Sequence, residues 1–215
     1  MRHVKYLALT TVFAFGSIAT VRAADTIKLA NVVELSGPGA SVGVLWGNAV
    51  HMAADDINAK GGILGQKIEV TDYDTQTNPS VSRSAVQKAL DDGPYAVVGP
   101  IYSGSVKVNM QLTQAAKIAQ FTGAAAADIT QMNNPYIFRM AFSQTNSMPR
   151  VARYIAEDLK AKTVAVVWVN DDMGKGGHET IAPEFEKRGL KVVADLPNEA
   201  NQASFTPDVV KIRGA

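Results

Sequence analysis

The sequence predicts an α/β protein with two lobes, each built on a parallel sheet flanked by helices. Three observations support this fold class. Short apolar segments alternate with helical segments along the whole chain, as in parallel strands joined by helices. Several of these segments are almost continuously apolar, as strands buried on both faces are. Residues 55–75 join a helix end to a strand through a short glycine-rich turn, which is half of a βαβ unit.

The first strand is expected at residues 27–33, which are nearly all apolar, and a helix at residues 45–59. The apolar face of that helix is formed by residues at helical spacing: Ala49, Val50, Ala53, Ala54 and Ile57. Gly61 and Gly62 follow, where a left-handed C-terminal cap requires residues without a Cβ. Gly65 allows a second tight bend, so the next strand is expected at residues 68–73.

The later elements continue this alternation. Asn78 or Ser80 is suited to cap a helix that runs to residue 91. The remaining elements of the first lobe are strands at residues 96–98, 118–122 and 136–140 and a helix at 103–116. The change of lobe is expected near residues 141–147. The second lobe then has a helix at 148–159, an apolar strand at 163–169, a glycine-rich turn at 174–177, a helix at 179–188, a strand at 191–196 and a helix from 206.

The first 23 residues have the features of a signal peptide. Arg2 and Lys5 give a positive start, residues 6–19 are apolar and uncharged, and Ala23 offers the small residue needed before a cleavage site. The alternative, a membrane anchor, is disfavoured because a spanning helix needs about 20 apolar residues. We expect cleavage after Ala23 and a soluble periplasmic product.

Charge and cysteine content exclude several classes of protein. Removal of the first 23 residues takes away three basic residues and changes the formal net charge from +1 to −2. A mixed, near-neutral surface is not suited to nucleic acid, which requires a clustered basic stripe. The chain has no cysteine. This excludes a disulfide scaffold, a zinc–thiolate site, a thiol nucleophile and a lipid-modified cysteine.

Four motifs occur in an order that identifies a family. They are D-I-N-A-K-G-G-I-x-G from Asp56, L-S-G-P from Leu35, V-V-G-P from Val97 and Y-I-F-R from Tyr136. From about residue 27 to its last residue, the chain resembles type I periplasmic substrate-binding proteins. Within these it is most similar to the leucine/isoleucine/valine-binding proteins of ABC transporters. The resemblance implies a periplasmic-binding-protein-like I fold, closure of two lobes on a small-molecule ligand, and an ABC permease in the inner membrane as partner.

The resemblance also implies how the chain is divided. We expect a signal peptide at residues 1–23, a ligand-binding lobe one at 24–141 and a partial lobe two at 142–215. In the resembled family the chain returns to lobe one after lobe two, and two complete lobes need more residues than follow the signal here. We therefore expect a truncated member, with lobe one nearly complete.

The strongest candidate site is the segment from Gly99 to Ser105, between a buried strand and a helix start. The carboxyl edge of a parallel sheet is where α/β folds bind ligands, and a helix N-terminus suits a carboxylate. Tyr102, Ser103 and Gly104 lie at this point, and the Ser103 hydroxyl adds a donor. The resemblance implies that Ser103 binds the α-carboxylate of an amino acid. The alternative is that Ser103 only caps its helix.

Four further ligand-contacting positions come from the resemblance alone. Ala124 and Ala126 match residues that hold the ligand partly through backbone atoms, although the family commonly has threonine in place of Ala126. Val42 and Met173 match an aromatic residue and a tyrosine of the family, so two hydroxyls are replaced by apolar surface. The alternative for the alanines is a small-residue loop that only packs closely. These changes weaken the expectation of an ordinary branched-chain amino acid and add a larger or more apolar carboxylate as an alternative ligand.

Enzymatic interpretations have little support, and we expect no catalytic residues, no metal and no cofactor. The glycines of segment 37–43 have the wrong spacing for a dinucleotide loop, and no G-x-S-x-G motif is present. His51 and Asp55 are four residues apart, which indicates an exposed helical pair more than a metal site. A sensor ectodomain and a secreted α/β enzyme remain alternatives. Trp46 is either an aromatic wall of the site or a core residue.

Overall fold

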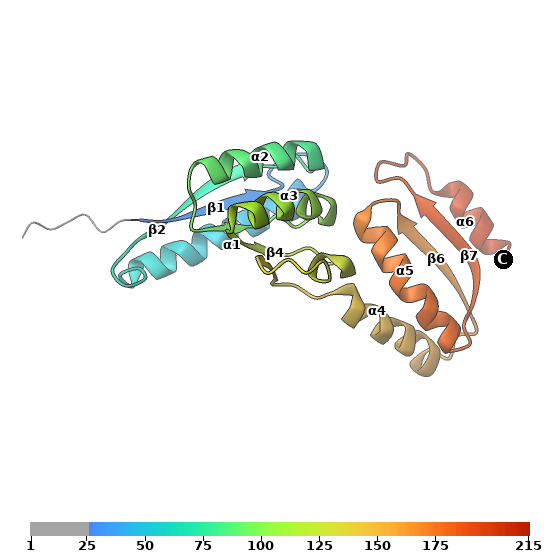
Figure 1. The fold of residues 1–215 in the computed structure, drawn as a ribbon. Helices are drawn as coiled ribbons and strands as arrows, with labels where there is room; N and C mark the ends of the chain where they lie inside the picture. Colours follow the sequence, from blue (N-terminus) through green and yellow to red (C-terminus); the bar gives the residue numbers. More distant parts are fainter. Residues whose placement is uncertain (1–25) are drawn as a thin grey trace, which may run out of the picture.

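The computed structural model describes residues 26–215, which form two parallel sheets with helices packed on them (Figure 1). The predicted signal peptide lies outside the described residues. The first sheet has the strand order β2-β1-β3-β4-β5 and the second the order β6-β7. The strands of the first sheet are β1 (Ile27–Val33), β2 (Ile68–Asp74), β3 (Ala96–Val98), β4 (Ala119–Thr122) and β5 (Ile137–Arg139). Those of the second are β6 (Thr163–Val169) and β7 (Lys191–Asn198).

The helices follow the strands in the order expected of an α/β fold. The first sheet carries α1 (Ala40–Ala59), α2 (Pro79–Asp91), α3 (Ser103–Ala116) and the 3₁₀ helix η1 (Ala127–Thr130). The second carries α4 (Gln144–Arg153), α5 (Asp172–Lys187) and α6 (Thr206–Arg213), with a π-helical turn at Tyr154–Asp158 after α4. None of the helices within residues 26–215 has the length and hydrophobicity needed to cross a bilayer.

Strand pairing and burial show which helices cover which face of the first sheet. Strand β1 lies inside the sheet and pairs in parallel with both β2 and β3. Alternate β1 residues, Ala30 and Val32, are buried against Val86 and Ala89 of α2. The opposite face meets α1, where Gly47 lies next to Asn31 and Val33. Because all strands run in parallel, the loops after β1, β3 and β4 meet at one edge of the sheet.

The structure confirms the predicted fold class and many element bounds. β1, β3, α3 and β6 have the predicted limits. The glycine cap of α1 is also confirmed, since Gly61 and Gly62 have φ of 103° and 81° and the Gly62 amide donates to the Ile57 carbonyl.

Three helix starts differ from the prediction. Helix α4 begins at Gln144, not at residue 148, and the Ser143 hydroxyl caps it by accepting a hydrogen bond from the Thr145 amide. Helix α1 begins at Ala40, not at residue 45, so Gly43 is helical and packs directly on the Glu34 backbone. Helix α5 begins at Asp172, and the predicted turn at residues 174–177 is wrong because these glycines are helical. The Asp171 carboxylate caps this helix by accepting a 2.7 Å hydrogen bond from the Gly174 amide.

Candidate functional site

The candidate site lies at the carboxyl edge of the first sheet, where α3 begins. Tyr102 is extended and forms the N-cap of α3, so Ser103 is its first helical residue. Ser103 is only 3% exposed, and its hydroxyl oxygen accepts a 3.3 Å hydrogen bond from the Ala126 amide. This bond brings the loop after β3 together with the loop after β4. Within residues 26–215 this is the one hydrogen bond of the Ser103 hydroxyl, so its proton remains available to a ligand acceptor.

Ala124 and Ala126 are fully buried behind Ser103, and their backbone groups already have partners. The Ala124 amide donates to the Thr122 hydroxyl at 3.1 Å. The Arg139 guanidinium donates to both carbonyls, at 2.8 Å for Ala124 and 2.7 Å for Ala126. Burial lowers the pKa of Arg139, with nearby Asp128 opposing that shift. These bonds hold the loop after β4 in place behind Ser103.

Tyr102 and Gly104 lie on either side of Ser103 and contact different parts of the molecule. The Tyr102 ring packs on Gly39, where an added Cβ would lie 2.6 Å from ring carbon Cε2. Burial raises the pKa of the Tyr102 phenol, and the charges of Glu34 and Asp171 add to that shift. A Cβ on Gly104 would lie 3.0 Å from a carboxylate oxygen of Asp172. The absence of a side chain at Gly104 thus lets the start of α5 approach the start of α3.

Lys107 links the two sheets beside this site. Its ammonium lies 2.8 Å from an Asp128 carboxylate oxygen and 2.7 Å from one of Asp172. Burial alone would lower the pKa of Lys107, but the hydrogen bonds and charges of the two aspartates outweigh it and raise the pKa. Lys107 and Asp172 are 65 residues apart in sequence, so no local pattern could have predicted this pair.

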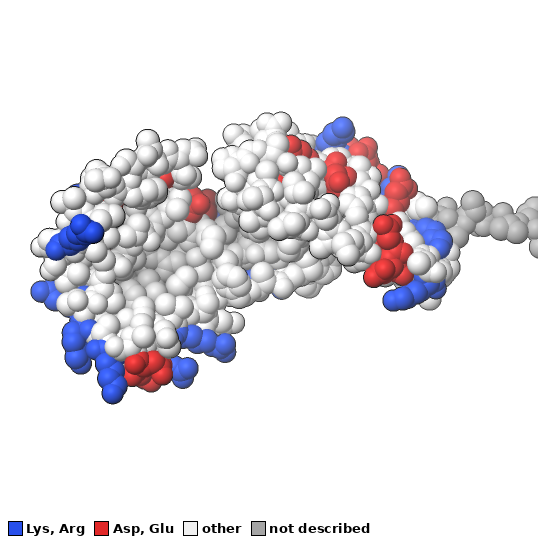
Figure 2. Space-filling view, turned by 180° about the vertical axis from the view of Figure 1, so that it is seen from behind, with Lys and Arg blue, Asp and Glu red and all other residues white. Residues whose placement is uncertain are grey.

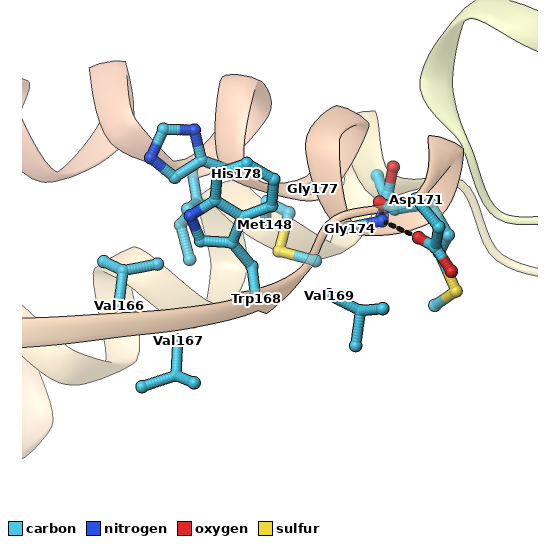
Figure 3. A pocket seen from close by; sticks show the side chains of 12 residues that line it. Met148, Val166, Val167, Trp168, Val169, Asp171, Gly174, Gly177 and His178 are labelled. Atoms are coloured by element: carbon cyan, nitrogen blue, oxygen red, sulfur yellow. Dashed lines mark hydrogen bonds between the residues drawn. The ribbon is translucent and has the colours of Figure 1, made fainter. Parts of the chain in front are cut away.

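The start of α5 also borders an apolar cavity of about 340 Å³ in the second half of the molecule (Figure 3). Its lining comes from α4, β6 and α5 and includes Met148, Val166, Met173 and Ile181. Trp168 and His178 stack in its wall at 4.9 Å between ring centroids (Figure 3). Seen from behind, the surface of this half is hollowed, and the hollow is almost free of charged residues (Figure 2).

The Trp168–His178 pair is held by one acidic residue. Asp195 of β7 accepts a 2.8 Å hydrogen bond from the Trp168 indole and lies 2.7 Å from His178 Nε2. Sequence reasoning missed this cluster and most of the cavity. The alternation of Val166 and Trp168 along β6 was an available signal, because it places both side chains on one face.

The predicted ligand-contacting residues are only partly brought together. Ser103, Tyr102, Gly104, Ala124 and Ala126 form one group at the sheet edge. Met173 is 46% exposed and adjoins this group through Asp172, its neighbour in sequence. Val42 is 51% exposed on α1 and does not line the apolar cavity beside α5.

Two other residues differ from the sequence interpretation. His51 lies 3.0 Å from Asp72 on β2, so its acidic partner is not Asp55. The Trp46 ring packs flat on Gly123, where an added Cβ would lie 2.9 Å from the ring, and its indole nitrogen is buried without a partner in the described residues. It also lines a second apolar cavity, between α1 and the sheet, rather than the Ser103 group.

Comparison with known proteins gives a family match over all described residues. A sequence model of the family described as "Periplasmic binding protein" matches residues 26–215. The leucine-specific-binding protein of Salmonella typhimurium is 33% identical over 191 residues, covering 88% of this chain and 52% of that protein. The Leu/Ile/Val-binding protein of Escherichia coli K12 is 29% identical, with coverage of 96% and 56%. The chain thus spans about half the length of the curated relatives it matches.

Solved structures agree with this match. The branched-chain amino acid transporter substrate-binding protein LivJ from Streptococcus pneumoniae, in complex with isoleucine, superposes with a TM-score of 0.80 at 28% identity. That match covers 89% of this chain and 55% of LivJ. A solute-binding protein of an ABC transporter from Rhodopseudomonas palustris HaA2, in complex with p-hydroxybenzoic acid, gives 0.78 at 26% identity, with coverage of 88% and 51%.

Proposed function

This chain belongs to the periplasmic binding protein family, and we propose that it is the extracytoplasmic solute-binding component of an ABC transporter. The proposed ligand is a branched-chain amino acid or a related small carboxylate, and the proposed partner is an ABC permease of the inner membrane. In this proposal residues 1–23 direct export, residues 24–141 form the first lobe, and residues 142–215 belong to the second. Related proteins are named as binding proteins, which supports a role without catalysis.

The observation that carries this proposal is the environment of Ser103. Its hydroxyl oxygen accepts the Ala126 amide, which leaves the hydroxyl proton for a ligand acceptor. The first N–H groups of α3 lack acceptors within the helix and stand at its positive end. A carboxylate placed there gains a hydroxyl donor and helix amides together, which is a common way to hold an anion. Ser103, Tyr102 and Gly104 are the first contacts in this proposal, with Ala124 and Ala126 behind them.

The second half of the molecule supplies the proposed apolar part of the site. Met173 stands where α5 approaches α3, and the cavity behind it is lined by methionine, valine and tryptophan side chains. Such a surface accepts a branched aliphatic side chain, and methionine adapts readily to different shapes. Ligand binding would then draw the two lobes together, as in hinge closure. Val42 is a peripheral contact in this proposal.

An aromatic carboxylate is a second candidate, supported by two observations. Two acidic residues at the start of α5 are already engaged, Asp171 with the Gly174 amide and Asp172 with Lys107. An amino acid's ammonium therefore finds no unpaired carboxylate among these two residues. The relative from R. palustris HaA2 was solved with p-hydroxybenzoic acid. A ligand-sensing ectodomain is a further alternative for the same binding site.

Thermal unfolding with a panel of compounds tests the proposal. The panel contains L-leucine, L-isoleucine, L-valine, benzoate and p-hydroxybenzoate, with leucinamide and benzamide as controls that lack the carboxylate. We expect at least one carboxylate to raise the melting temperature, since a ligand of the native state stabilises it. The matching amide should have no effect. A melting temperature that no carboxylate changes would contradict the proposal, and turnover of any compound would favour an enzyme.

A further inference from the structure

Glu34 is a fully buried carboxylate directly behind the candidate site. It follows β1 at the carboxyl edge of the sheet, and each of its two oxygens accepts one backbone amide. The Ile101 amide donates to Oε2 and the Tyr102 amide to Oε1, both at 3.2 Å. These amides immediately precede Ser103. One side chain thus fastens the last two residues before α3 to the end of β1.

Glu34 is closely packed by the residues around it. A Cβ on Gly43 of α1 would lie 1.9 Å from the Glu34 carbonyl oxygen, so α1 packs directly on this residue. The titratable groups that face it are Asp74 from β2 and the Tyr102 phenol, and within residues 26–215 no cationic side chain pairs with it. Burial raises the pKa of the Glu34 carboxyl, and the two amides oppose that shift. Burial of a carboxyl group costs free energy, and here hydrogen bonds from backbone amides, those of Ile101, Tyr102 and Glu34 itself, oppose that cost.

We propose that Glu34 is a positioning residue that fixes the Gly99–Ser103 loop in the shape that binds a carboxylate. It occupies the Ile101 and Tyr102 amides, which otherwise would attract the ligand anion or water. The ligand is thereby directed one residue further, to the Ser103 hydroxyl and the first free amides of α3. This inference rests on the proposed function, and it adds a residue that determines where the anion sits.

A nuclear magnetic resonance experiment tests the contact without any ligand. In a pH titration of the ligand-free protein, the Ile101 and Tyr102 amide signals should move together as the Glu34 carboxyl gains its proton. In Glu34→Gln these movements should disappear, because glutamine does not titrate. The Ser103 amide signal should also be displaced, since a glutamine offers one acceptor oxygen to two amides. The control Glu69→Gln changes an exposed residue of β2 and should leave all three signals in place.

Binding then tests the consequence, with L-leucine and p-hydroxybenzoate as the probes. Loss of one charge-assisted bond to the loop should weaken binding about tenfold in Glu34→Gln, with a similar melting temperature. Glu34→Asp keeps the charge but is one methylene shorter, so it should also bind more weakly. Unchanged binding in both variants, or a Ser103 signal unmoved by Glu34→Gln, would overturn the inference. If the wild type binds neither probe, the proposed ligand classes are wrong, and the Ser103 signal alone then decides the role of Glu34.

Discussion

Asp74 organises the turn that leads from β1 into α1. Its Oδ1 accepts amides of Leu35, Ser36 and Gln76 at 2.8 to 3.1 Å, and its Oδ2 accepts the Ser36 hydroxyl at 2.6 Å. Burial raises the pKa of this carboxyl, but the Ser36 hydroxyl and the three amides outweigh it and lower the pKa. The L-S-G-P motif is therefore shaped by a residue 38 positions away from its serine.

Asp74→Ala should lower the free energy of unfolding by about 2 kcal/mol, because three amides lose their acceptor. Asp74→Asn should cost less, since its oxygen can still accept all three. Folding lowers the pKa of Asp74, so its negative charge stabilises the folded protein at pH values above the ordinary pKa of a carboxyl group. This stabilisation is lost as the pH falls through the pKa of the folded state. The stability difference between wild type and Asp74→Asn should thus shrink in acid. Urea unfolding at several pH values measures it, and a pH-independent difference would contradict the assignment.

Individual site residues could be predicted where the signal was local. Ser103 follows a buried strand and begins a helix, and both features are visible in sequence. Glu34 was not predicted, because nothing local distinguishes a buried glutamate at a strand end from an exposed one. The role of Lys107 depends on Asp128 and Asp172, which only the folded chain brings near it. Ion pairs between residues so far apart in sequence leave no periodic pattern in the sequence from which they could be predicted.

Among the helices, α1 shows how two glycines in one element can have different roles. Gly43 and Gly47 are both buried on the side that faces the sheet. A Cβ on Gly43 would lie 1.9 Å from the Glu34 carbonyl oxygen. On Gly47 the nearest atoms, in Asn31 and Leu35, would be 3.5 Å away, which is ordinary contact. Only the first position therefore requires glycine.

Gly43→Ala should lower the free energy of unfolding by about 3 kcal/mol or more, because backbone must move to admit the methyl group. Gly47→Ala should raise it by about 0.5 to 1 kcal/mol, since alanine is the better helix former. Chemical denaturation of both variants measures the contrast. Equal effects at the two positions would show that α1 does not pack on Glu34 as described.

Among the elements, strands were predicted more accurately than helix starts. Apolar runs define β1, β3 and β6 directly, whereas the glycines near the starts of α1 and α5 suggested turns. Tertiary packing explains the difference, because these glycines allow close approach of backbone: Gly43 to Glu34, and Gly174 to the Val169 carbonyl. The asparagine cap of α2 was predictable because Asn78 accepts the Ser80 amide two residues on, a local bond.

At the scale of the whole molecule, the Lys107–Asp172 pair joins α3 to α5 and hence one sheet to the other. In a double-mutant cycle, Lys107→Met and Asp172→Asn should show a coupling of about 0.5 to 1 kcal/mol at low salt. The coupling should shrink at 1 M salt, because both side chains are partly exposed. The Lys187–Glu184 pair, which lies within one helix, is the matched control. Strict additivity of the Lys107 and Asp172 variants would show that the pair does not hold the two halves together.

The central claim is that a ligand carboxylate binds at the start of α3 through Ser103. Titration calorimetry with the stabilising carboxylate, comparing wild type with Ser103→Ala, tests it most directly. Losing a charge-assisted donor should weaken binding about tenfold to a hundredfold. The melting temperature should also fall, because the buried Ala126 amide loses its acceptor, so the affinity decides the test. Ser84→Ala, an exposed serine of α2, is the control and should bind like wild type. Equal affinity of Ser103→Ala and wild type, with a clearly lower melting temperature, would contradict the account and leave Ser103 a structural residue only.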